Sequence, residues 1–476
     1  MRQFKFSCLP LYALFFLVLF FSNCKKNADL TPPCCINPLT ASNIPSVYIN
    51  TNGGTIIDDP KIPATLDIKY GDSLDFSHRI GIELRGSTSQ MLFDQKSFGL
   101  ELWDPTGSGV GGTPLAFPKE TDFILYAVAN DKSLLRNVLL YELSNAIGMY
   151  AVRTQYVNLY LNGNYNGLYV FMEKIKRDVN RVNITKMLAT DNSGTNVSGG
   201  YIFKIDKAAG DNTIGGWAGD ATYTSNMSWR SNYDQSGNLL LTAPYGTKTG
   251  KETYFIYNYP QSDVITSEQK KYISKYVDDF EKTLLSANFK DPSVGYAAYI
   301  DVPSFIDFML LNEFSHNPDG YRLSTFLHKD RGAKLKMGPI WDFNIAFGNH
   351  DNGTLAATNN WIYDFNSYVP GDTWLIHFWW KRLLQDPAFT AQAKARWASI
   401  RADKFSNENM NAIIDKHVGY LQKYNAINKH FAKWQVLGVK MPFNGYVGQT
   451  YNDELTFFRN WINARLAWMD AQIKLL

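Results

Sequence analysis

Short runs of alternating hydrophobic and polar residues are frequent in the first third of the chain, and this period of two is typical of β-strands. Three of these runs are predicted strands, at residues 47–49, 80–84 and 97–102. The clearest pair is Tyr156–Leu161 and Asn164–Met172, which flank the dipeptide Asn162-Gly163. Because Asn-Gly is the preferred centre of a type I′ turn, we expect a tight hairpin here.

Farther along, the hydrophobic spacing changes to the period of three to four residues that is typical of helices. Helices are expected at residues 131–148 and 303–315, and over most of the chain from Trp374 onward. Another helix begins at the capping box that Thr266 forms with Gln269.

The middle of the chain is less regular. Residues 190–262 are rich in Gly, Asn, Ser and Thr, so we expect loops around a single strand at 201–205. Two more short strands are predicted at 324–328 and 334–337. A strand-rich first half and a helix-rich second half together predict an α+β fold.

The N-terminus has the pattern of an export signal. Arg2 and Lys5 precede the apolar stretch Leu9–Phe21, which is short for a membrane span. The following Ser-Asn-Cys resembles the lipobox of bacterial lipoproteins, in which Cys24 would carry the lipid. Ordinary secretory cleavage near Ser22, or a retained anchor, would use the same pattern.

This reading divides the chain into three parts: a signal peptide at 1–23, a Pro-rich tether at 24–45 and a folded body at 46–476. We expect an outer-membrane or surface lipoprotein of a bacterial cell envelope, attached to the membrane only through its N-terminal lipid. No cysteine follows Cys35, so the folded body depends on no disulfide. The role of the pair Cys34 and Cys35 stays open.

Composition narrows the function further. Hydrophobic residues make up 45% and charged residues 19%, which argues against disorder. The 47 basic residues nearly balance the 44 acidic ones, so no polyanion-binding surface is indicated and nucleic acid is not an expected partner.

Two aspartates carry the strongest chemical signal. Asp319 lies in a Pro-Asp-Gly turn after a predicted helix, and Asp342 follows the apolar run Met337–Trp341. They bracket a short hairpin. Kinase-type phosphotransferases have this arrangement: one Asp takes the proton of the substrate hydroxyl, and a second Asp binds Mg²⁺. Two alternatives are open: Asp319 is an ordinary turn residue, or the two acids are a glycosidase pair. Asp342 needs a partner, because its surroundings are apolar.

Four motifs in order resemble the CotH family, the atypical kinases related to spore-coat protein H. The motifs are Arg85-Gly86-Ser87-Thr88-Ser89, Gly199–Asp206, Asn317–Thr325 and Gly338–Gly348. The resemblance implies an atypical protein-kinase-like two-lobed fold, with a strand-rich N-lobe at about 46–175 and the helix-rich C-lobe, with an insertion, at about 176–476. It also implies ATP, Mg²⁺ or Mn²⁺, and an unidentified protein acceptor phosphorylated on Ser or Thr.

The resemblance also assigns candidate roles. Asp319 would be the catalytic Asp, and Asp342 with Asn344 would bind the metal. Family members commonly have a second Asp where Asn344 stands, so a weak or inactive kinase that acts as a surface module for protein or glycan is the alternative. Lys204 and Asp206 would lie at the cleft without an assigned role.

The nucleotide-binding candidates lie in the N-terminal half. The loop 85–90 would cover the phosphates through Arg85, Ser87 and Ser89, although a plain Gly-Ser turn has the same sequence. Lys96 would contact the phosphates and pair with Glu142; otherwise both are surface residues. Glu173 lies where a hinge would hold adenine.

Overall fold

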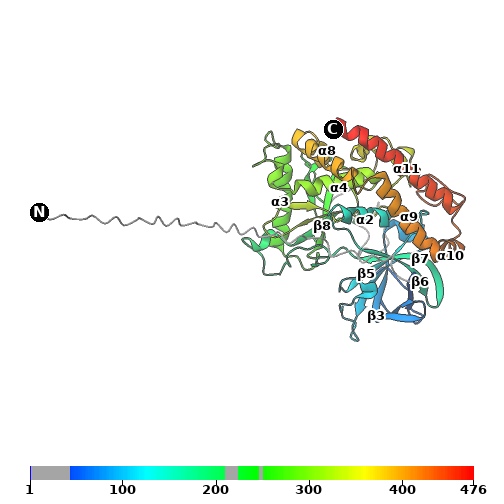
Figure 1. Cartoon of the computed structure of the whole chain (residues 1–476). Coiled ribbons are helices and arrows are strands. Elements are labelled where there is room, and N and C mark those ends of the chain that lie inside the picture. The colour runs from blue at the N-terminus through cyan, green and yellow to red at the C-terminus, as the bar shows by residue number, and fades with distance from the viewer. Residues whose placement is uncertain (2–42, 209–222, 246–249) are drawn as a thin grey trace.

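The computed structural model describes residues 43–208, 223–245 and 250–476, together with Met1 (Figure 1). The expected leader and Cys24, and the tether pair Cys34 and Cys35, fall outside the described residues. Within the described ranges, no helix is both long and apolar enough to cross a membrane.

The first strands form a closed barrel in the order β1-β2-β3-β4-β5-β7-β6. Neighbours are antiparallel, except that β1 pairs in parallel with β6 and so closes the barrel. A separate hydrophobic core, which includes Val47, Leu66, Ile80 and Leu100, fills the barrel. The strands are β1 (Ser46–Asn50), β2 (Ile62–Tyr70), β3 (Ser73–Arg85), β4 (Ser97–Trp103), β5 (Asp122–Ala127), β6 (Thr154–Leu161) and β7 (Asn164–Glu173).

The predicted hairpin is confirmed as β6 and β7. Asn162 and Gly163 have φ of 49° and 80°, the left-handed values that a type I′ turn needs at both central positions. The side chain of Asn162 also accepts a hydrogen bond from the backbone N–H of Thr51 at 2.9 Å. The turn therefore also binds the end of β1.

A second sheet has the strand order β12-β11-β8-β10-β9. The expectation of a single strand in residues 190–262 is wrong, because β9 and β10 pair beside β8. The sequence of β9 is polar and does not alternate clearly, so it gave little sign of a strand. Hydrogen bonds to β10 hold it in the extended conformation. The strands are β8 (Tyr201–Ile205), β9 (Ser228–Asp234), β10 (Glu252–Tyr259), β11 (Thr325–Lys329) and β12 (Leu335–Met337).

Helices are the other main elements of the described chain, and Figure 1 shows most of them on the side of the molecule away from the barrel. The capping box of Thr266 and Gln269 is confirmed at the start of α3. The longer helices are α2 (Arg136–Ala146), α3 (Ser267–Leu285), α4 (Val302–Ser315), α8 (Pro387–Arg401), α9 (Asn407–Lys423), α10 (Ala426–Lys433) and α11 (Tyr451–Gln472). Short ones are α1 (Thr88–Leu92), α5 (Gly353–Ala356), α6 (Phe365–Tyr368) and α7 (Trp379–Leu383).

The last helix holds the end of α4 in the core. Arg465 of α11 is fully buried and donates from Nε and Nη2 to the backbone oxygen of Glu313, at 2.8 and 2.6 Å. The carboxylate of Glu313 accepts the backbone N–H groups of Ile362 and Tyr363, at 2.8 and 2.9 Å. These contacts fix the point at which the chain leaves α4 and enters the turn that contains Asp319.

The C-terminal helices also return to the barrel, where α10 packs against β7 (Figure 1). The backbone N–H of Leu168 donates to Nδ1 of the buried His430 at 3.2 Å, and the indole of Trp434 donates to the backbone oxygen of Asn166 at 2.8 Å. The mixed α+β composition is therefore confirmed, with barrel and helices joined by contacts between residues distant in sequence.

Candidate active site

A cleft of about 420 Å³ brings together segments from both halves of the chain. The loop after β3, the end of β8, the turn after α4 and the loop after β12 all line it. Its lining includes most of the residues expected at the site, namely Arg85, Ser87, Ser89, Lys204, Asp206, Asp319, Asp342 and Asn344.

Asp342 is the acid without a partner in this cleft. Its φ of 64° is left-handed, which is uncommon for a residue with a side chain, and its backbone N–H donates to the hydroxyl of Tyr141 at 3.1 Å. Within the described residues its carboxylate forms no hydrogen bond or ion pair. Burial, and then the charges of Asp319 and Asp206, raise the pKa of Asp342 to about 7. Asp319 and Asp206 pair with Arg322 and Lys204, whereas Asp342 has no paired cation among the described residues.

Asp319 lies in the turn that follows α4. Its backbone N–H donates to Oδ1 of Asn317 at 3.2 Å, and Gly320 is required because a Cβ there would lie 2.7 Å from Oδ1 of Asn312. Nη2 of Arg322 donates to Oδ1 of Asp319 at 3.0 Å. This contact orients the carboxylate and leaves its second oxygen without a donor in the described part of the chain.

Asn344 lies two residues after Asp342. Its Nδ2 donates to Oδ1 of Asn130 at 3.1 Å, so its own Oδ1 is left as an acceptor. The described residues contain no group of three or more His, Cys, Asp or Glu side chains suited to a metal ion. The oxygens of Asp342 and Asn344 nevertheless fit Mg²⁺, which is usually bound by one or two protein ligands together with waters and substrate phosphates.

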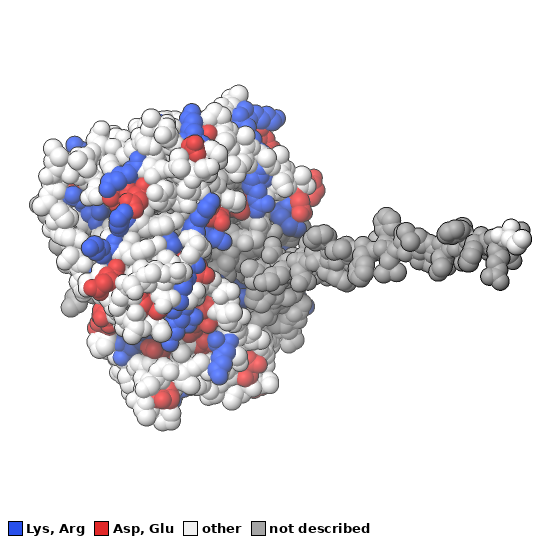
Figure 2. Space-filling model, turned by 90° about the vertical axis from the view of Figure 1, so that its left-hand side faces the viewer, with Lys and Arg blue, Asp and Glu red and all other residues white. Residues whose placement is uncertain are grey.

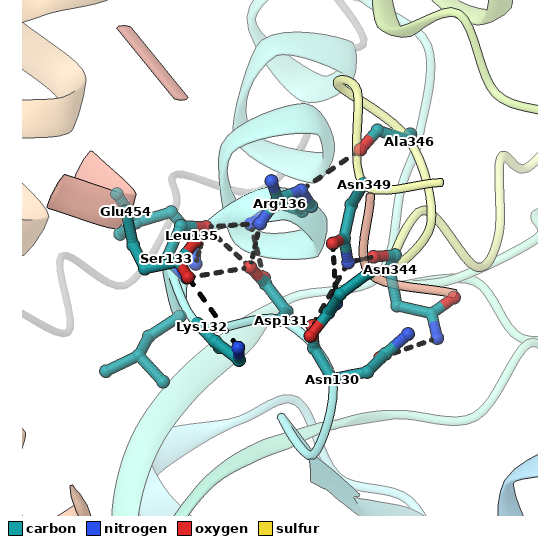
Figure 3. A network of polar contacts seen from close by, with 12 residues as sticks. Asn130, Asp131, Lys132, Ser133, Leu135, Arg136, Asn344, Ala346, Asn349 and Glu454 are labelled. Atoms are coloured by element: carbon teal, nitrogen blue, oxygen red, sulfur yellow. Dashed lines mark hydrogen bonds and ion pairs between the residues drawn. The ribbon is translucent and has the colours of Figure 1, made fainter. Parts of the chain in front are cut away.

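A buried polar network holds the loop that contains both metal candidates (Figure 3). Nη1 of Arg136 pairs with Oδ1 of Asp131 at 2.5 Å, and its Nε donates to the backbone oxygen of Ala346 at 3.0 Å. Nδ2 of Asn349 donates to the backbone oxygens of Asn130 and Asn344, at 3.1 and 2.7 Å. The segment 130–136 thus fixes the path of the chain after Asp342.

The expected helix at 131–148 begins only at Arg136, because of this network. The carboxylate of Asp131 accepts the backbone N–H groups of Ser133 and Arg136, at 3.2 and 2.8 Å, and Leu134 has a φ of 65°. The turn was missed in the sequence. The signal that could have found it is the polar segment Asn130–Ser133, which interrupts the apolar residues 123–129 and Leu134-Leu135.

The loop between β3 and β4 forms one wall of the cleft. Gly86 has a φ of 104°, which a residue with a side chain rarely adopts, and the short helix α1 follows. The guanidinium of Arg85 lies 5.9 Å from the centre of the Trp341 ring. Lys207, which the sequence did not single out, donates to Oγ1 of Thr88 at 3.0 Å. Two cationic side chains therefore adjoin this loop.

The expected ion pair between Lys96 and Glu142 does not form. Nζ of Lys96 donates to the backbone oxygens of Gln90 and Phe93, both at 2.5 Å, and so closes the end of α1 instead of entering the cleft. Glu142 faces α9, where it binds Lys416 and accepts from Nε2 of His417 at 2.8 Å. The sequence did not predict these partners of Glu142, because they lie more than 270 positions farther along the chain.

The side chain of Glu173 also points away from the cleft. It is fully buried, pairs with Nη1 of Arg153 at 2.6 Å and accepts the hydroxyl of Tyr150 at 3.0 Å. A role for this carboxylate in holding adenine is therefore not supported by its contacts. The next residue, Lys174, lines the cleft instead.

Comparison with known families agrees with this architecture. The family model described as CotH kinase protein matches residues 82–469, which is most of the chain. The chain therefore belongs to the CotH kinase family. No curated protein matches this sequence.

Proposed function

We propose that this protein transfers the phosphoryl group of ATP to Ser or Thr hydroxyls of a protein acceptor, with Mg²⁺ or Mn²⁺, in the bacterial cell envelope. Cys24 would carry the lipid that attaches it to the membrane. One observation carries the catalytic part: Asp319, the uncompensated Asp342 and the loop 85–89 line the same cleft. Membership of the CotH kinase family adds to this support.

Asp319 is the residue proposed to act on the acceptor. Its free oxygen would accept the hydrogen bond of the substrate hydroxyl. It would then take the proton as the hydroxyl oxygen bonds to the γ-phosphorus and the bond to the ADP oxygen breaks, so that ADP leaves. Arg322 holds the other oxygen and so limits rotation of the carboxylate. The proposed reaction thus needs Asp319 oriented before the acceptor arrives.

The opposite wall of the cleft is proposed to hold the donor. Asp342 and Asn344 would bind the cation, which when present would neutralise charge on the phosphates. Arg85 and Lys207 provide the positive side chains next to the loop, the role first expected of Lys96. Backbone N–H groups after Gly86 can also approach phosphate oxygens.

The test is phosphoryl transfer by the purified full-length protein. Labelled ATP with Mg²⁺ or Mn²⁺ and a generic protein acceptor should give labelled Ser or Thr, and Asp342→Ala and Asp319→Ala should each abolish it. Asp279→Ala, on the surface of α3, is the matched control and should keep full activity. Labelling that persists unchanged in Asp342→Ala would refute the proposal.

A second candidate is a surface binding module with little or no transfer activity. Asn344 favours it, because an amide replaces the charge of a carboxylate at the cation site. Thermal unfolding separates the two functions, since a ligand that binds only the native state raises its stability. No shift with any nucleotide and cation would support the binding module.

A further inference from the structure

The amide of Asn344 can serve a cation in only one of its two orientations. Its Oδ1 accepts and its Nδ2 only donates, so the same side chain turned over would present N–H groups to the cation. A carboxylate has no such restriction, because both of its oxygens accept. With Asn at position 344, the cation site therefore depends on how this amide is turned.

One contact sets that orientation in the structure. Nδ2 of Asn344 donates to Oδ1 of Asn130 at 3.1 Å, and Figure 3 shows the two amides facing each other. This is the only hydrogen bond of the Asn344 side chain in the described part of the protein. Because its nitrogen is engaged with Asn130, its Oδ1 is left for the cleft that it lines together with Asp342.

The backbone on both sides of this contact is held by other side chains. Nδ2 of Asn349 donates to the backbone oxygens of Asn130 and Asn344, at 3.1 and 2.7 Å. Nδ2 of Asn444 donates to the backbone oxygen of Asn130 at 2.9 Å and to Oδ1 of Asn349 at 2.7 Å. None of these bonds uses the side chain of Asn130. That side chain is therefore left with a single polar contact, the one to Asn344.

Asn130 is also a costly residue at this position. It is only 2% exposed, and its Nδ2 exposes less than 1 Å² and has no hydrogen-bond partner within the described ranges. More than nine in ten buried polar groups in proteins are paired, and an unpaired one lowers stability. An apolar side chain of similar size would avoid this loss. The acceptor oxygen that Asn130 offers to Asn344 is the one property that such a replacement would lack.

We propose that Asn130 is a positioning residue for the cation site, where it holds Oδ1 of Asn344 toward the cation. This inference rests on the proposed phosphotransferase function. Without the acceptor of Asn130, the amide could turn and donate from Nδ2 to the acids of the cleft, since hydrogen bonds to a carboxylate are stronger than those to neutral groups. Such a bond would compete with the cation for the same negative charge. Residues behind a metal ligand commonly fix its orientation in this way.

The test is a double-mutant cycle on the affinity of the full-length protein for Mn²⁺, measured from the electron paramagnetic resonance of the free ion. Asn130→Ala should weaken binding about tenfold, the loss usual for a residue that orients a metal ligand. In an Asn344→Asp background the same change should alter the affinity by less than about twofold, because a carboxylate presents an oxygen in either orientation. Equal losses in the two backgrounds would overturn the inference.

Asn444→Ala is the matched control. It removes another buried amide of the same network, which contacts the backbone of Asn130 and makes no contact with the amide of Asn344. Its melting temperature should fall while its affinity for Mn²⁺ stays unchanged. A loss of affinity as large as that of Asn130→Ala would mean that the firmness of the network, and not the orientation of Asn344, determines binding.

Asn130→Leu guards against an effect of the cavity that Ala would leave. It keeps about the same volume and has no acceptor, so it should weaken Mn²⁺ binding as much as Asn130→Ala does, again with rescue by Asn344→Asp. Wild-type affinity in Asn130→Leu would contradict the proposal.

Asp342→Ala separates failure of this inference from failure of the proposed function. It should abolish Mn²⁺ binding, because it removes the charged ligand of the same site. If binding depends on Asp342 and the cycle shows no coupling between Asn130 and Asn344, the inference alone falls. If the wild-type protein binds no Mn²⁺, or binds it as well without Asp342, the cation site of the proposed function falls with it.

Discussion

Asp131 and Asp342 are two aspartates near the candidate site, and they differ in how many partners their carboxylates have. The carboxylate of Asp131 pairs with Arg136 and accepts the hydroxyl of Ser133 at 2.5 Å, together with two backbone N–H groups. Asp342 receives none of these, and burial, together with the charges of Asp319 and Asp206, raises its pKa to about 7. A compensated acid fixes the chain, whereas an uncompensated one stays ready to bind a cation. The first supports the loop on which the second lies.

The largest expected effect comes from breaking the compensated acid. Arg136→Met leaves Asp131 buried without its cation, so the free energy of unfolding should fall by about 3–5 kcal/mol. Urea denaturation measures this change. Lys275→Met removes the exposed pair with Asp279 and should cost at most about 0.5 kcal/mol. Similar losses in both variants would show that the buried network has no special role.

Removing the acid without a partner, Asp342, should lower activity and leave stability unchanged or higher. Asp342→Asn should lower phosphoryl transfer by about 10²–10³-fold, as for other groups that stabilise developing charge. Its stability at pH 8 should be equal or higher, because the variant no longer carries an unpaired charge in the cleft. Activity assays and thermal unfolding check the two parts. A destabilised variant would mean that Asp342 has a structural partner.

His430 extends the comparison to a buried base. Burial lowers its pKa to about 3, against about 6.5 in the unfolded chain, so the native imidazole stays neutral while the unfolded one is protonated. Its contribution is complete above pH 6.5 and is lost as the pH falls toward 3, by about 1.4 kcal/mol per pH unit. Denaturation of the protein and of His430→Asn across this range should show a smaller pH slope in the variant. Equal slopes would mean that His430 is protonated in the native state.

The smallest expected effect is that of Asn344→Asp, which adds a second acid next to Asp342. A second carboxylate beside Asp342 should tighten Mn²⁺ binding about tenfold, which corresponds to about 1.4 kcal/mol. The protein without cation should melt at a lower temperature, because another negative charge joins the cluster. Titration with Mn²⁺ and thermal unfolding measure both. Unchanged Mn²⁺ affinity would place the cation elsewhere.

Local sequence patterns were sufficient to predict the hairpin, the capped helix α3 and the presence of Asp319 and Asp342 on neighbouring turns. These features depend on residues within a few positions of one another. The closure of the barrel was not predictable, because the parallel pairing of β1 with β6 joins segments more than 100 residues apart and alternation does not name a strand's neighbour.

Side-chain partners were the hardest part of the site to predict. Lys96 and Glu142 have the residue types of an ion pair, but each found other partners once α1 and α9 were in place. Lys207 reaches the loop 85–89 because it follows β8 of the second sheet, whose end lines the cleft. Residue type and spacing thus identified the acids of the candidate site and Arg85, whereas the position of Lys207 depended on tertiary structure.

The contacts of Arg465 in α11 with Glu313 in α4 have a consequence for folding during synthesis of the chain. Among the described residues, the only ion pair of the buried Glu313 is with Arg465. A growing polypeptide therefore lacks this partner until Arg465 has been synthesised, 152 positions after Glu313. A product that ends before Arg465 should therefore hold the end of α4, next to the turn containing Asp319, less firmly.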